Sequence, residues 1–126
     1  MRYLCLSIAA MLCFLSLPQQ AKASPLLGLW TENGGPGAAR MAPCSDAPQR
    51  LCATGYDGLP NGTIGRKGAV VLRDLKPDGQ KRWRGTYLDG GRTLPATVKL
   101  VANGKVTMRV CLVVLCQTVT YTRVGE

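Results

Sequence analysis

Cysteine spacing is the feature of this sequence that most clearly indicates chemistry. Two of the six cysteines, Cys5 and Cys13, lie in an apolar N-terminal run, and the other four form the patterns C-x7-C and C-x4-C. A zinc site is disfavoured, because neither spacing is usual for zinc ligands and the sequence has no histidine. In a short chain, the even number favours two disulfides among Cys44, Cys52, Cys111 and Cys116.

Catalytic constellations are absent from the sequence. Without histidine, the usual general base and the centre of a Ser-His-Asp triad are missing. Most carboxylates fall in or beside expected turns, where Asp commonly satisfies backbone groups; they are Glu32, Asp46, Asp57, Asp74, Asp78, Asp89 and Glu126. The glycines form no phosphate-binding motif. We therefore expect no enzymatic activity, no cofactor and no metal.

The N-terminus has the pattern of a secretory signal peptide. Met1-Arg2 is a basic start, Tyr3 to Leu17 is apolar, and Ala21-Lys22-Ala23 is a small-x-small cleavage signature. The apolar run is too short to span a bilayer, which needs about 20 apolar residues. We expect a signal peptide over residues 1–23 and a single domain over 24–126, in a periplasmic or secreted protein that is not an integral membrane protein.

The charge balance is basic. The net charge of +9 falls by two when Arg2 and Lys22 leave with the signal peptide. A basic exported protein is attracted to anionic lipid, acidic polymers or acidic proteins, although solubility alone also explains the charge. Nucleic acid is not an expected partner, because the chain leaves the cytoplasm.

Turn residues divide the remaining chain into short alternating runs. Asn103-Gly104 is a strong hairpin signal, and Pro77-Asp78-Gly79 and Asp89-Gly90-Gly91 mark two further turns. No window shows a helical period. Regular short strands of this kind indicate an antiparallel sandwich or barrel with about eight strands, near 27–32, 38–44, 51–56, 68–75, 82–88, 94–102, 105–111 and 116–124.

Alternation assigns the two faces of these strands. Val106, Met108 and Val110 share the apolar face of one strand, so Cys111 points outward. Thr118, Thr120 and Thr122 line the outer face of the last strand, together with Cys116, which leaves Arg123 on its apolar face. A buried arginine is costly unless it is paired.

These faces favour local disulfides. Two outward cysteines that flank a four-residue loop can lie opposite each other across a hairpin, which suits a bond between Cys111 and Cys116. Cys44 and Cys52 can likewise clip the loop between them. The crossed pairings remain open.

Gly28-Leu29-Trp30 resembles the G-x-W motif of lipocalins. In that fold the tryptophan closes one end of an eight-stranded barrel, and an arginine from the final strand packs across the indole. Arg123 matches that position. The resemblance implies a structural lock of Trp30 and Arg123, in which cation–π attraction offsets the burial of the guanidinium. Ordinary core packing of Trp30 is the alternative.

Most of the chain resembles domain-of-unknown-function family 2147, a family of exported bacterial proteins. The similar segments are "PLLGLW", "APCSDAPQRLC", "IGRKGAVVLRDLKPDGQKRWRGTYLDGGRTLPATVKL" and "MRVCLVVLCQTVTYTRV". Val110 stands where that family usually has glycine, and Tyr121 where it usually has tryptophan. The resemblance implies a small antiparallel up-and-down β-barrel, lipocalin-like, that carries a small ligand, and it implies no established activity.

Our first functional hypothesis is a non-enzymatic barrel that binds a small apolar or amphipathic ligand, lipid-like or aromatic. The inward candidates for the cavity are Met41, Trp83, Tyr87, Val98, Leu100, Met108, Val119 and Tyr121. A barrel of this size can equally be filled by side chains.

The alternative is an envelope protein with a filled barrel that acts through surface contacts with a protein or an anionic component. Its candidate patch is Lys81, Arg82 and Arg84, which flank Trp83. The apolar loop Leu112 to Leu115 at the rim of the barrel is a second candidate contact. Both segments also have plainer explanations, as a solvated strand face and as packing over the barrel end.

Mass spectrometry of the protein from its own periplasm tests the expected processing. The denatured mass should correspond to a chain that begins at Ser24 and contains two disulfides. A mass that retains residues 1–23, or one that shows free thiols, would contradict this prediction.

Overall fold

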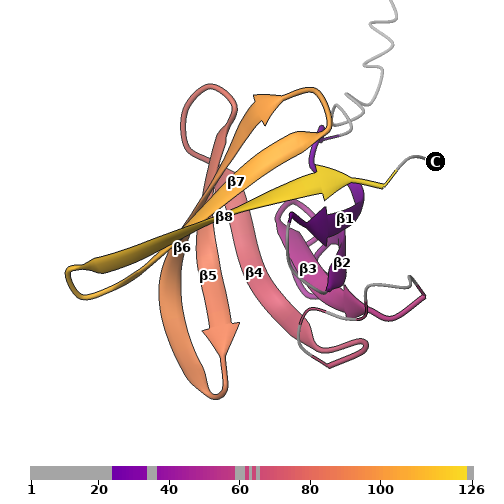
Figure 1. Cartoon of the computed structure of the whole chain (residues 1–126), viewed down its shortest axis with the longest axis horizontal. Helices are drawn as coiled ribbons and strands as arrows, with labels where there is room; N and C mark the ends of the chain where they lie inside the picture. Colours follow the sequence, from indigo (N-terminus) through magenta and orange to yellow (C-terminus); the bar gives the residue numbers. More distant parts are fainter. Residues whose placement is uncertain (1–23, 34–36, 59–61, 63, 65, 125–126) are drawn as a thin grey trace, which may run out of the picture.

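The chain folds into a closed barrel of eight antiparallel strands in sequence order (Figure 1). The computed structural model describes residues 24–33, 37–58, 62, 64 and 66–124. Within them there is no helix, and every strand pairs with its neighbours in sequence, with β8 returning to β1. The expected up-and-down β-barrel is therefore confirmed. The predicted signal peptide lies outside the described residues.

The strand positions agree closely with those expected from turn residues and alternation. They are β1 (Gly28–Glu32), β2 (Ala38–Pro43), β3 (Leu51–Tyr56), β4 (Val70–Pro77), β5 (Arg82–Asp89), β6 (Arg92–Ala102), β7 (Lys105–Leu112) and β8 (Leu115–Arg123). The largest differences are in β4, which begins two residues later than expected, and in β6, which begins two residues earlier.

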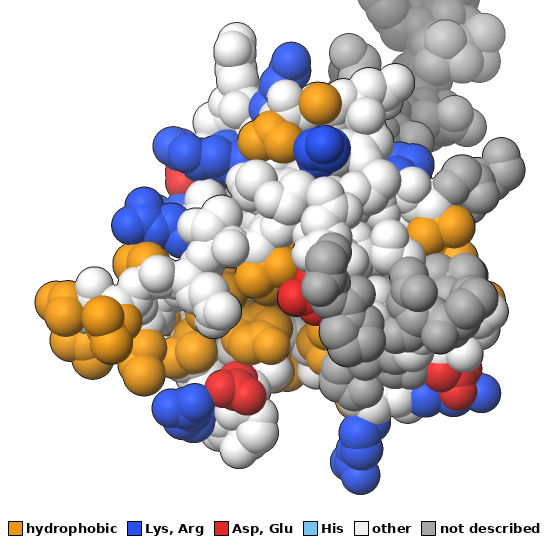
Figure 2. Space-filling model, viewed as in Figure 1, with side chains coloured by type: hydrophobic (Ala, Val, Ile, Leu, Met, Phe, Trp, Pro, Cys, Tyr) orange, Lys and Arg blue, Asp and Glu red, His pale blue; other side chains and the backbone are white. Residues whose placement is uncertain are grey.

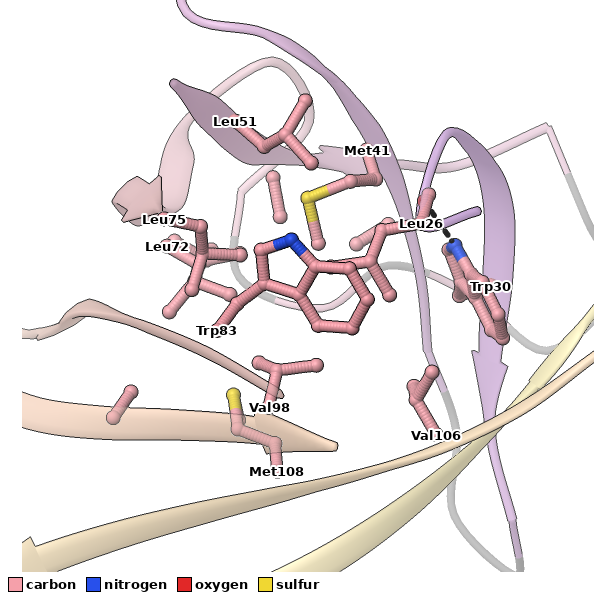
Figure 3. Close-up of a cluster of buried hydrophobic side chains, with 14 residues drawn as sticks. Leu26, Trp30, Met41, Leu51, Leu72, Leu75, Trp83, Val98, Val106 and Met108 are labelled. Carbon is pink, nitrogen blue, oxygen red and sulfur yellow. Dashed lines mark hydrogen bonds between the residues drawn. The ribbon is translucent and has the colours of Figure 1, made fainter. Parts of the chain in front are cut away.

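The core lies inside the barrel and follows the alternation. Ala96 and Val98 of β6 and Val106 and Met108 of β7 are buried, whereas the residues between them point outward. Figure 3 shows the Trp83 indole of β5 in the middle of this cluster, surrounded by aliphatic and methionine side chains from the other strands. Trp83 therefore fills the middle of the interior.

A bulge in β4 explains why that strand departs from simple alternation. The register against β5 shifts between Arg73 and Lys76, and Asp74 adopts a φ of 57°. An extra residue at a bulge bends the strand, as barrel closure requires. Opposite the bulge lies Gly85, where a Cβ would stand 2.7 Å from the carbonyl oxygen of Arg73. Only glycine accommodates this close approach.

β1 pairs with β8 and so closes the wall of the barrel. The contact between Trp30 and Arg123 lies at one end of this seam. Trp30 and Arg123 are partners in the register of these two strands, and the guanidinium lies 4.5 Å from the centre of the indole ring. The same guanidinium donates hydrogen bonds to the carbonyls of Leu27 and Pro25. Trp30, 4% exposed, donates from Nε1 to the carbonyl of Leu26 at 2.8 Å (Figure 3). Two side chains thus fix the segment that covers this end.

Gly28 is required by this arrangement for two reasons. Its φ is +122°, a conformation that L side chains rarely adopt. A Cβ at this position would also lie 2.9 Å from Nη1 of Arg123. The glycine and the tryptophan of the G-x-W motif therefore serve the same contact.

Both disulfides are the local pairs that the sequence favoured. Cys44 pairs with Cys52, and Cys111 pairs with Cys116, whose Cα atoms lie 4.0 Å apart as direct cross-strand partners. The sequence predicted a four-residue loop from Leu112 to Leu115, and this prediction was wrong. Leu112 and Leu115 are still strand residues, and only Val113 and Val114 form the turn.

A search of the described residues for a helix long and apolar enough to cross a membrane finds none.

Replacing Arg123 by alanine should lower the thermal stability. The substitution removes the contact with the indole and leaves two backbone carbonyls without their donor, which together cost about 2 kcal/mol. For a domain of this size, that lowers Tm by about 10 °C in a melt followed by circular dichroism.

The matched control is Arg109→Ala, which removes an exposed arginine from the outer face of β7. Its Tm should change by a degree or two at most. A protein with Arg123→Ala that melts together with the wild type would show that the Trp30–Arg123 contact contributes nothing to closure.

Candidate functional site: the barrel interior and its mouth

An apolar cavity remains inside the barrel. Its volume is about 50 Å³, and no polar surface lines it. Leu26 and Trp30 line it, so it reaches the closed end. Its other lining residues come from most of the strands and from the loop before β4: Ala39, Met41, Ala53, Ile64, Val71, Leu72, Tyr87, Val98, Val106, Met108 and Tyr121.

A wider hollow, which we call the mouth, adjoins the cavity at the opposite end of the barrel. The mouth has a volume of about 430 Å³, and four residues line both spaces: Ile64, Tyr87, Met108 and Tyr121. The remaining residues of the mouth are Glu32, Asp89, Arg92, Leu94, Val110, Leu112, Leu115, Cys116, Gln117 and Val119. A molecule that enters here therefore meets a mixed rim before an apolar interior.

The structure brings together most of the predicted cavity residues. Met41, Tyr87, Val98, Met108 and Tyr121 line the cavity, and Val119 lines the mouth. Two others lie elsewhere: Trp83 fills the core, and Leu100 packs against that core from near the end of β6.

Several lining residues escaped the sequence-based prediction. Leu26 precedes the first strand, and Ile64 lies in a loop, so neither takes part in an alternation that could assign it inward. The rim charges Glu32, Asp89 and Arg92 lie at strand ends, where alternation no longer assigns a side chain to one face. From the sequence, the two acidic residues among them are expected only to satisfy backbone groups in turns.

The rim of the mouth has an acidic character despite the basic chain. Asp89 forms an ion pair with Arg92 at 2.8 Å, whereas no lysine or arginine of the described residues lies within 4.0 Å of Glu32. Burial raises the pKa of the Tyr121 phenol well above its usual range, with contributions from Glu32 and Tyr87. Burial, Asp89 and Glu32 raise the pKa of Tyr87 in the same direction. Both phenols therefore stay neutral at physiological pH.

A second hollow lies on the outside of the barrel and contains much of the predicted basic patch. This outer groove, about 580 Å³, is lined by Asp78, Arg82, Arg84, Thr97, Lys99, Thr107, Arg109, Cys116 and Thr118. Arg82 and Arg84 are exposed, as predicted, but the Nε atom of each lies 3.6 Å from a single Asp78 oxygen. Lys81 is exposed beside the groove without lining it. The sequence did not indicate Lys99 and Arg109, because register alone brings them beside Arg82 and Arg84.

The described residues contain no group of three or more His, Cys, Asp or Glu side chains that could hold a metal ion. Their cysteine sulfurs are all committed to disulfides.

No family model matches the chain, and neither a curated protein nor a solved structure matches it. The resemblance to domain-of-unknown-function family 2147 stays a prediction from the segments quoted above.

Replacing Tyr121 by phenylalanine should make stability less sensitive to alkaline pH. The folded pKa of Tyr121 is raised, so its contribution is complete below the unfolded pKa of about 10 and is lost as pH rises toward the folded pKa. Between pH 9 and 11, the wild type should lose about 1.3 kcal/mol through this group. Urea unfolding at both pH values, compared with Tyr121→Phe, measures the difference.

Tyr56→Phe provides the comparison, because Tyr56 lies outside the mouth against Arg40. An identical pH dependence in the wild type and Tyr121→Phe would mean that the phenol is not held in an apolar, acidic surrounding.

Proposed function

We propose that this protein is an exported, non-enzymatic binding protein that takes the apolar end of a small amphipathic ligand into its barrel. One observation carries the proposal: the apolar cavity and the mouth share Ile64, Tyr87, Met108 and Tyr121. An apolar interior space thus lies directly beside a hollow large enough for the rest of a ligand.

Volume sets the kind of ligand. A drug-sized molecule occupies a pocket of about 300–1,000 Å³. The mouth, at about 430 Å³, falls in this range, whereas the cavity, at about 50 Å³, holds only a few atoms. The bulk of the ligand therefore sits at the mouth, and a narrow alkyl or aromatic end enters the cavity.

The charge at the rim determines which charge the polar head of the ligand should carry. The ion pair of Asp89 with Arg92 neutralises both groups, so Glu32 is the rim charge that a ligand meets. Neutral phenols beside it offer hydrogen bonds. We infer a preference for a cationic or zwitterionic head, which the net charge of +7 left after loss of Arg2 and Lys22 would alone oppose.

The two disulfides indicate an oxidising, non-cytoplasmic environment. Together with the N-terminal pattern of the sequence, they support a periplasmic or secreted carrier.

Titration calorimetry with dodecyltrimethylammonium and dodecyl sulfate, each below its micelle concentration, tests the proposal on the protein purified from the periplasm. The cationic amphiphile should bind more tightly, and Glu32→Gln should remove the preference. Met108→Trp adds bulk at a residue that lines both the mouth and the cavity and should weaken binding at least tenfold.

The matched control is Thr107→Trp, which adds the same indole to the outer face of the same strand. Its binding should equal that of the wild type. Should Met108→Trp not fold, Val110→Trp obstructs the mouth without touching the cavity. Equal binding by all variants, or a preference for dodecyl sulfate, would overturn the proposal.

A further inference from the structure

The β7–β8 hairpin extends well beyond the wall of the barrel (Figure 1). On the β1 side, the backbone N–H of Asn33, directly after β1, donates to the carbonyl of Thr120 at 2.9 Å, which is the hydrogen bond nearest the tip among the described residues. On the other side, β7 leaves β6 after Val110, which pairs with Ala96. Val110 pairs with Gln117 of β8, so the segment from Cys111 to Cys116 is the part of the hairpin that lies beyond both neighbouring strands.

The end of this hairpin is apolar and exposed. Leu112, Val113, Val114 and Leu115 are 44%, 91%, 87% and 74% exposed, and we call these four residues the tip. Figure 2 shows the hydrophobic tip projecting at the left of the molecule. Soluble proteins rarely expose contiguous apolar side chains without a partner for them.

A disulfide constrains the tip, and the turn within it has a backbone conformation that valine disfavours. A two-stranded ribbon is marginally stable in water, yet the Cys111–Cys116 disulfide joins the strands directly behind the tip. Val113 has a φ of 57°, which is unfavourable for a β-branched residue and is usually left to glycine or asparagine in such a turn. An aliphatic side chain is thus kept at the most exposed point although the backbone disfavours it.

Positive charge lies beside the base of the hairpin. The outer groove shares Thr107, Arg109, Cys116 and Thr118 with the hairpin strands. It carries four cationic side chains against the single carboxylate of Asp78. In Figure 2, Lys and Arg side chains lie next to the projecting tip, on the same face.

We propose that the tip inserts into an anionic lipid bilayer while the outer groove faces the headgroups. The combination of aliphatic side chains with nearby arginines suits the interfacial layer of a membrane, where apolar groups enter and cations meet phosphates. A protein partner is less well matched, because a stable interface buries about 800 Å² on each side and the tip is narrow and convex. The inference goes beyond ligand binding and does not depend on it.

Vesicle flotation of the periplasmic protein tests the proposal with phosphatidylcholine alone and with equal parts of phosphatidylcholine and phosphatidylglycerol. The anionic vesicles should bind at least tenfold more protein at 0.1 M salt, and 0.5 M salt should remove most of the difference. Val113→Asn with Val114→Ser should abolish binding, while Tm stays equal or rises because asparagine tolerates the positive φ. Arg84→Gln with Arg109→Gln should remove the preference for anionic lipid.

Matched controls lie at the far end of the barrel or in a distant loop. Val101→Ser replaces a valine that is 53% exposed, and Lys105→Gln with Arg66→Gln removes two charges. Both should bind like the wild type.

Insertion itself is measured with Val114→Trp, whose emission should be quenched by lipids brominated in their acyl chains. Trp30 and Trp83 are buried and should not respond. Tip variants that float like the wild type, an unquenched Trp at position 114, or a dimer that depends on the tip in ultracentrifugation would overturn the proposal. The amphiphile titrations with Met108→Trp test ligand binding independently of membrane insertion, because Met108 faces the interior and the tip does not.

Discussion

The stacking of the Arg123 guanidinium on the Trp30 indole is the contact on which the rest of the barrel depends. It joins the first strand to the last, and it anchors the segment before β1 through two backbone carbonyls. An eight-stranded sheet with open edges would expose two rows of unpaired backbone groups, and closure removes them. Because the segment before β1 covers one end of the barrel, the interior adjoins the mouth at the opposite end.

The two proposed contacts lie in different parts of the molecule. The ligand binds in the barrel interior, and the bilayer contacts the surface at the tip. Trp83 and its neighbours fill most of the barrel, so the remaining cavity accepts only the end of a ligand. The mouth borders on the base of the hairpin, since Leu112 and Leu115 line it. A protein bound through its tip would therefore hold the mouth close to the bilayer surface, where amphipathic molecules are concentrated.

Alternation and turn chemistry were sufficient to predict much of this architecture. Where a strand keeps a strict period of two, as in β6 and β7, the buried residues could be named in advance. The same alternation assigned both Cys111 and Cys116 to the outside, and so predicted their bond. Prediction weakened where the backbone leaves the regular pattern. The bulge at Asp74 moves the end of β4, and the turn at Val113 lacks the glycine that would have revealed its length. The outer groove and the mouth arise from register among several strands, which no single segment of sequence encodes.

Closure between β1 and β8 also sets the order in which structure can form. Each hairpin pairs neighbours in sequence, but β1 has to wait for the last strand, because Trp30 meets a partner more than ninety positions away. Bringing such distant segments together costs loop entropy before any contact repays it. A chain that emerges from a ribosome or a translocation pore with its N-terminus first therefore stays an open, unsealed sheet until β8 has been delivered. Assembly of the barrel therefore requires that the chain has been delivered at least as far as β8.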